Sequence, residues 1–152
     1  MSSRIITSAL AALALLWTVA SATAQQFGTE AEAKAMLERA VAALKANEKT
    51  ALSEFNDKEN KNFRDRDLYV FCFDMSDGKF TAHPNPTLMG TDVRALKIKD
   101  DPLGQKLYDA AKEGTVTTVD YNFPKPGTTD AVPKESFVTR VGGEGCGVGY
   151  YK

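Results

Sequence analysis

The chain has 152 residues, with 19 basic side chains, 20 acidic side chains and a single histidine. This near balance of charge argues against nucleic acid or an anionic membrane surface as a binding partner. A chain of this length, even after removal of an N-terminal targeting segment, suits one domain that buries a single hydrophobic core.

The first residues have the pattern of a secretory signal peptide. Arg4 is followed by an apolar run over residues 5–20 and then by the small residues Ala22 and Ala24. The run is shorter than the roughly 20 residues of a spanning helix, so we expect cleavage before Gln25. The prediction is a mature domain of residues 25–152 in the periplasm or outside the cell. An uncleaved anchor is the alternative, although no basic cluster follows the run to stop transfer.

A helical pattern begins at Thr29, where Thr29-Glu30-Ala31-Glu32 has the form of a capping box. Apolar residues then recur at helical spacing as far as Phe55. The pattern predicts one long amphipathic helix. Its apolar stripe weakens at Asn47 and Glu48, which marks the place where a bend or break is expected.

The period changes at Leu68. Residues 68–73 are rich in aromatic and β-branched side chains, residues 75–78 supply turn chemistry, and residues 79–83 resume an extended pattern, which together predict a β-hairpin. Two prolines after His83 end it, and residues 84–99 read as a loop with at most a short helical turn. Asp101 is then expected to cap a short helix that has Pro102 at its first position and ends at Gly114.

Three further extended segments follow, over residues 115–123, 136–141 and 146–151. Two hairpins around a helical insertion predict an α+β domain with an antiparallel sheet. The long helix is expected on one face of this sheet and the insertion, residues 84–114, on the other. A small ligand would lie between the insertion and the sheet.

Cys72 and Cys146 are the two cysteines of the chain. Their spacing fits neither a C-x-x-C redox motif nor a zinc cluster, and the predicted compartment is oxidising, so a disulfide is the natural interpretation. Closing a loop of about 75 residues would stabilise the fold by roughly 4 kcal/mol. Two buried free thiols are the alternative.

Several segments together resemble the single Cache family of extracytoplasmic sensor domains. The resemblance spans nearly all of residues 25–152, and its order and spacing are more specific than any one fragment. The matching segments are DLYVF (67–71), DGKFTAHP (77–84), LMG (88–90), VDY (119–121) with PKP (124–126), KESFV (134–138) and GVGYY (147–151).

The resemblance implies a PAS-like, five-stranded antiparallel sheet with a long N-terminal helix and a pocket for a carboxylate or an amino acid. It also implies that the first and last strands are neighbours, which would place Cys72 beside Cys146. Family members usually sit between two membrane helices of a chemoreceptor or kinase and pass ligand occupancy inward. Because the sequence ends at Lys152 without an output domain, we expect this chain to act with such a partner or to carry a ligand.

Five residues are candidates for the ligand site. Strand alternation sends Tyr69, Phe71 and Phe73 to one face and their neighbours to the other, and we expect the aromatic set to face the ligand, with plain core packing as the alternative. His83 can donate or accept a hydrogen bond, either to a ligand or within the fold. Lys134 occupies the family's recurring lysine position, and a carboxylate would need such a cation. The predicted set is Tyr69, Phe71, His83, Tyr121 and Lys134.

Two other functional hypotheses have less support in the sequence. An accessory subunit that docks to a receptor, with no ligand pocket, is the second hypothesis. An exported enzyme is the third, because a lone histidine has neither a nucleophile motif nor an orienting partner in the sequence. We expect no cofactor and no metal, since there is no second histidine and the cysteines have another use.

Overall fold

The computed structural model describes residues 26–152. The predicted signal peptide, residues 1–24, lies outside the described residues. Within them, no helix combines the length and apolarity needed to cross a membrane.

The N-terminal helical region is two helices, α1 (Glu30–Ala46) and α2 (Glu48–Asn56). The capping box at Thr29 is present, with the Thr29 side chain accepting from the Glu32 backbone N–H. The break falls where the sequence predicts it. Asn47 is extended, with φ −163°, and its side chain accepts a hydrogen bond from the backbone N–H of Thr50, so it ends one helix and caps the next.

Replacing the cap at the break is expected to weaken the fold. Asn47→Ala removes the acceptor for the Thr50 N–H and should lower the free energy of unfolding by about 1 kcal/mol in a urea titration. Lys49→Ala, on an exposed neighbour in the same turn, is the matched control and should change it by less than about 0.5 kcal/mol. Equal effects of the two substitutions would contradict the capping role.

The strands form one antiparallel sheet. In spatial order β3, β2, β6, β5 and β4 make the predicted five-stranded sheet, and a sixth, two-residue strand, β1, pairs with the start of β2. The first long strand and the last are therefore neighbours, as the resemblance implies. The bounds are β1 (Arg64–Asp65), β2 (Leu68–Asp74), β3 (Phe80–Ala82), β4 (Thr117–Pro124), β5 (Ala131–Val141) and β6 (Glu144–Tyr151).

β5 and β6 begin earlier than predicted. β5 begins at Ala131 and includes Pro133, which lacks a backbone donor. Pro133 is tolerated because the β5–β6 register begins only at Lys134, and beyond it the Lys152 backbone N–H bonds to the Pro133 carbonyl, a group that proline still supplies. β6 begins at Glu144, so two residues of the predicted glycine-rich turn belong to the strand.

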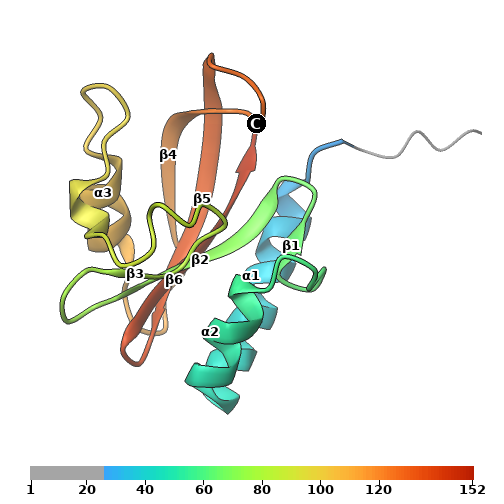
Figure 1. Cartoon of the computed structure of the whole chain (residues 1–152), viewed down its shortest axis with the longest axis vertical. Helices are drawn as coiled ribbons and strands as arrows, with labels where there is room; N and C mark the ends of the chain where they lie inside the picture. The colour runs from blue at the N-terminus through green and yellow to red at the C-terminus, as the bar shows by residue number, and fades with distance from the viewer. Residues whose placement is uncertain (1–25) are drawn as a thin grey trace, which may run out of the picture.

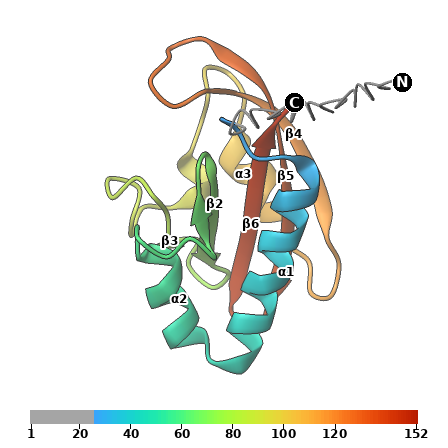
Figure 2. The same cartoon turned by 90° about the vertical axis from the view of Figure 1, so that its right-hand side faces the viewer.

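Helices cover both faces of the sheet (Figure 1). On one face α1 and α2 pack on a core that includes Leu68, Val70 and Cys72 of β2. On the other face lie the 3₁₀ turn η1 (Val93–Ala95) and α3 (Leu103–Ala110), over a second core that includes Phe71 and Phe73. The predicted alternation along β2 is confirmed. Figure 2 shows α1 lying along β6 and β5.

The insertion contains one short 3₁₀ turn, within the predicted limit of at most a short helical turn, and the predicted short helix. The prediction that Asp101 caps α3 is wrong. Pro102 occupies the N-cap position, one residue later than the sequence suggested, and no side chain caps the helix. Asp101 instead forms an ion pair with Lys106. α3 also ends at Ala110, before the expected stop at Gly114.

The disulfide is present. Cys72 on β2 lies directly opposite Cys146 on β6, with a Cα–Cα distance of 4.1 Å. Both residues are fully buried in the core beneath α1 and α2. The prediction of a bridge between neighbouring first and last strands is confirmed.

Candidate ligand-binding site

Lys134 is a buried cation surrounded by aromatic rings. It lies on β5, opposite Tyr121 of β4 and Tyr151 of β6, and is 2% exposed. Its Nζ lies 4.6 Å from the ring centroid of Tyr151, 5.0 Å from that of Tyr69 and 5.3 Å from that of Phe123. No hydrogen bond or ion pair joins the Lys134 ammonium to any residue in the described part of the chain. We call Lys134 and the three rings of Tyr69, Phe123 and Tyr151 the Lys134 cage.

Burial lowers the pKa of Lys134 to about 8 from its ordinary value of 10.5, and the negative charge of Asp67 acts weakly in the opposite direction. The rings compensate part of the lost hydration through cation–π attraction, worth about 0.5–2 kcal/mol per contact. A buried ammonium still lacks the anion that normally accompanies it in a protein interior. The Lys134 cage therefore favours an anionic guest.

A pair of hydroxyl groups lies beside the cage. The Tyr121 and Ser136 hydroxyl oxygens are 2.8 Å apart, and burial raises the pKa of Tyr121. Gly149 on β6 makes room for them, because a Cβ there would lie 2.5 Å from Ser136 Oγ and 2.9 Å from Lys134 Cε. These hydroxyls can donate to or accept from a polar guest.

His83 lies at the edge of the same cluster. Its ring meets Tyr69 edge-on at a centroid distance of 5.4 Å and Phe80 at 5.3 Å. Its Nδ1 accepts a hydrogen bond of 2.9 Å from the backbone N–H of Asn85. Burial lowers the pKa of His83 to about 4, so the imidazole is neutral at pH 7.

The structure gathers four of the five predicted residues into one cluster and places the fifth beside it. Tyr69, His83, Tyr121 and Lys134 are linked by the contacts above. Phe71 lies further along β2, in the core of that face, where its ring covers Gly147 of β6. Whether these residues bind a ligand stays a prediction.

Sequence reasoning did not select Asp67, Ser136 or Tyr151. Ser136 could have been found by counting two residues from Lys134 along the strand, and the alternate glycines 145, 147 and 149 signalled close packing on one face of β6. Asp67 is 6% exposed. Its Oδ1 accepts a 2.5 Å hydrogen bond from the backbone N–H of Gly28, and its Oδ2 is buried without a hydrogen-bond partner in the described residues.

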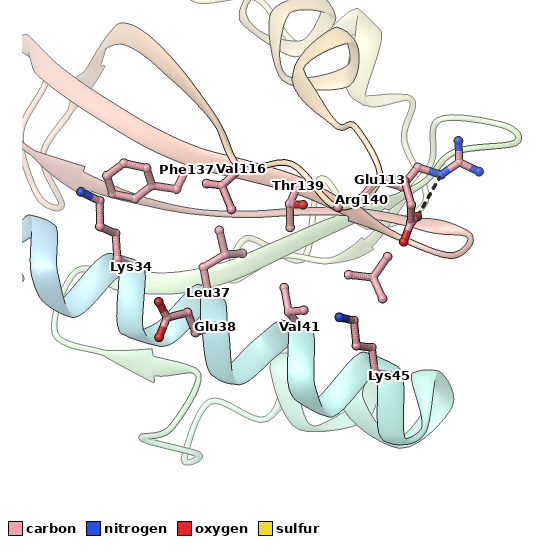
Figure 3. A pocket seen from close by; sticks show the side chains of 12 residues that line it. Lys34, Leu37, Glu38, Val41, Lys45, Glu113, Val116, Phe137, Thr139 and Arg140 are labelled. Carbon is pink, nitrogen blue, oxygen red and sulfur yellow. Dashed lines mark ion pairs between the residues drawn. The ribbon is translucent and has the colours of Figure 1, made fainter.

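A groove of about 440 Å³ lies on the opposite face of the sheet, between α1 and β5 (Figure 3). Leu37 and Val41 of α1 face Phe137 of β5 across it, and Lys34 and Lys45 stand at its rim. None of the five predicted site residues lines this groove.

One group of buried metal-ligand atoms occurs in the described residues, at Cys72, Glu144 and Cys146. Because the two sulfur atoms are bonded to each other, they are not available as thiolate ligands. This group is therefore not a candidate metal site, and the absence of a metal stays a prediction.

The structure resembles three solved sensor domains. A methyl-accepting chemotaxis protein from Vibrio parahaemolyticus is 24% identical, with TM-score 0.63 and coverage of 80% of this chain and 86% of that one. A periplasmic sensor domain of a chemotaxis protein is 28% identical, with TM-score 0.57 and coverage of 80% and 88%. A Cache chemosensory domain studied for carboxylic acid recognition is 23% identical, with TM-score 0.51 and coverage of 76% and 83%.

No curated protein matches the chain. The sequence model of the family described as Single Cache domain 2 matches residues 7–151, beginning inside the predicted signal segment. The chain therefore belongs to the single Cache domain family of sensor domains.

Proposed function

We propose that this domain binds a small organic acid at the Lys134 cage and acts outside the cytoplasm with a membrane receptor or histidine kinase. The observation that carries the proposal is a buried ammonium group that has aromatic neighbours and no bonded anion among the described residues. A ligand carboxylate supplies the missing counter-charge, and the Tyr121 and Ser136 hydroxyls supply further hydrogen bonds.

The energetic cost of Lys134 supports a binding role. A lysine buried without an anion destabilises the ligand-free fold, and groups of this kind concentrate at functional sites. Part of that cost is recovered when an anion binds, so ligand occupancy stabilises the domain. A signal-transduction role, such as chemotaxis, fits this coupling and is supported by the similarity to the periplasmic sensor domain of a chemotaxis protein.

The proposal contains no catalytic step. The Nδ1 of His83 accepts from the Asn85 backbone N–H and its ring packs against Tyr69 and Phe80, and within residues 26–152 no hydrogen bond joins the imidazole to a nucleophilic side chain. The chemistry of the cage, a cation in an aromatic enclosure, suits the holding of an anion.

The affinity for a carboxylate should fall at alkaline pH. Only protonated Lys134 attracts an anion, and with a pKa of about 8 in the free protein, raising the pH from about 6.5 to about 9.5 should weaken propanoate binding about 30-fold. Calorimetric titration at both pH values measures this change. His83 stays neutral over this range because burial lowers its pKa, and the surrounding tyrosines stay protonated because burial raises the pKa of Tyr69 and Tyr121 and raises that of Tyr151 to about 12.

Propanamide is the neutral control, since it keeps the shape of propanoate without the charge. It should bind much more weakly than propanoate at the lower pH. An affinity for propanoate that does not change with pH would count against Lys134 as the anion site. If none of a broad set of small carboxylates binds, the proposed function is wrong.

A further inference from the structure

We propose that the groove between α1 and β5 is a second ligand site, which binds an unbranched alkyl chain that has an anionic head group, such as a medium-chain fatty acid. The groove lies on the other face of the sheet from the Lys134 cage and shares no residue with it. The inference therefore goes beyond the proposed function and does not depend on it.

The inner surface of the groove is largely apolar. Leu37 and Val41 of α1 face Phe137 of β5 across it (Figure 3). Val116, which also lines the groove, is 57% exposed and is one of two large apolar side chains that are exposed in the described part of the chain. An apolar chain in the groove would remove these side chains from water, which is favourable.

The dimensions of the groove suit one extended chain. Lys34 and Lys45 mark its two ends on α1, eleven positions apart, which corresponds to about 16 Å of helix (Figure 3). Over this length a volume of about 440 Å³ gives a mean cross-section of about 27 Å².

This cross-section excludes the common secondary structures as guests. A helix with its side chains is about 10–12 Å across, and a strand in a packed sheet occupies about 4.8 Å by 10 Å. A single row of methylene groups is narrower than either. With bonds of about 1.5 Å, ten carbons have a contour length of at most about 14 Å, which is within the length of the groove.

A lysine stands at each end of the groove. The Lys34 Nζ lies 4.9 Å from the ring centroid of Phe137 and pairs with Glu30 on the same helix. Lys45 forms no ion pair within residues 26–152. A chain that lies along the groove in either direction therefore brings an anionic head group to an ammonium group.

The two acidic side chains of the groove are compatible with this orientation. Glu113 accepts a hydrogen bond from the backbone N–H of Gly142, and its carboxylate lies 4.0 Å from Arg140 Nε, so its charge is partly compensated. Glu38 lies between the two lysines on α1. It repels an anionic head group from the middle of the groove but does not repel an uncharged alkyl chain.

Calorimetric titrations of hexanoate, octanoate and decanoate into the natural protein test the site. Saturating propanoate is present throughout, so that the Lys134 cage is filled if it binds carboxylates. The affinity should rise about two- to fourfold for each added CH₂, because each methylene leaves water. Octan-1-ol should bind only about threefold more weakly than octanoate, since an ion pair with an exposed lysine adds little. An affinity that does not rise with chain length overturns the inference.

Val116→Asp puts a carboxylate on the apolar wall and should weaken decanoate binding by about tenfold or more. Because Val116 is mostly exposed, the variant should fold, which thermal unfolding checks. Asn122→Asp adds the same charge at an exposed position of β4 outside the groove and should change the affinity by less than about twofold. Equal losses in the two variants overturn the inference. If Val116→Asp does not fold, the chain-length series on the natural protein decides alone.

The two ligand sites can be told apart. Folded Lys134→Met should bind decanoate as the natural protein does, and Val116→Asp should bind propanoate as the natural protein does. Loss of decanoate binding in folded Lys134→Met would place the alkyl chain at the cage and overturn this inference. If decanoate binds but no small carboxylate does, the proposed function is wrong and the groove site stands. A dimer that Val116→Asp dissociates, with no decanoate bound to either form, would make the groove an interface between copies and also overturn the inference.

Discussion

Lys134→Met is expected to abolish carboxylate binding and, at the same time, to raise the free energy of unfolding of the ligand-free protein. Methionine fills a similar space without a charge that needs an anion. The lowering of the Lys134 pKa from 10.5 to about 8 corresponds to a penalty of roughly 3 kcal/mol for the charged form. Loss of the cation–π contacts offsets part of the gain, so a net increase of about 1–2 kcal/mol is expected.

The sign of the pH dependence follows from the direction of the shift. Because the folded-state pKa lies below the unfolded value, the penalty is fully present below about pH 8 and disappears as the pH rises through 10.5. The stabilisation by Lys134→Met should therefore be large near pH 6.5 and small above about pH 10.5 in urea titrations. Lys58→Met, at an exposed turn position, controls for the loss of one positive charge and should leave both stability and binding nearly unchanged. A less stable Lys134→Met protein that still binds carboxylates would refute the argument.

The local part of the fold could be read from the sequence because local rules decide it. The helix start at Thr29 and the break at Asn47 depend on side chains that bond to their own backbone a few residues away. The predicted cap of α3 was wrong because the same local rules leave the exact end of a helix undetermined. The capping rule selects Asp101, but a one-residue shift puts Pro102 in its place, and terminal positions are the least certain part of a helix assignment.

The ends of β5 and β6 depended on pairing, which a single sequence shows poorly. Pro133 is typical of a loop, yet it is a strand residue because it pairs with Asn122 of β4 and lies beyond the last register pair of β5 with β6. The strand order itself came from the family resemblance. Periodicity alone would have left the position of β6, between β2 and β5, undecided.

The site was predictable to the extent that alternation within a strand determines it. Tyr69 lies on the face that alternation along β2 predicts, but Tyr151 meets Lys134 only through the pairing of β5 with β6, which alternation within one strand does not reveal. The groove beside α1 shows the same limit, because segments far apart in sequence line it and no sequence motif marks it.

Removing the disulfide by Cys72→Ala with Cys146→Ala should lower the free energy of unfolding by about 4 kcal/mol. The bond closes a loop with a sequence separation of 74 residues, and the chain-entropy model assigns about that value to such a loop. Loss of the two buried sulfur atoms adds a small packing cost. Urea unfolding of the double variant measures the sum.

The reduced natural protein is the matched comparison, because it keeps both sulfur atoms and lacks only the bond. If the cross-link dominates, reduced protein and double variant should have similar stability, both far below that of the oxidised protein. Both cysteines lie in the core under α1 and α2, on the other face of the sheet from the Lys134 cage, so the folded double variant should bind carboxylates within about threefold of the natural protein. Two free thiols in denatured, unreduced protein, or a loss below about 1 kcal/mol, would show that non-covalent packing holds β2 against β6 without the bond.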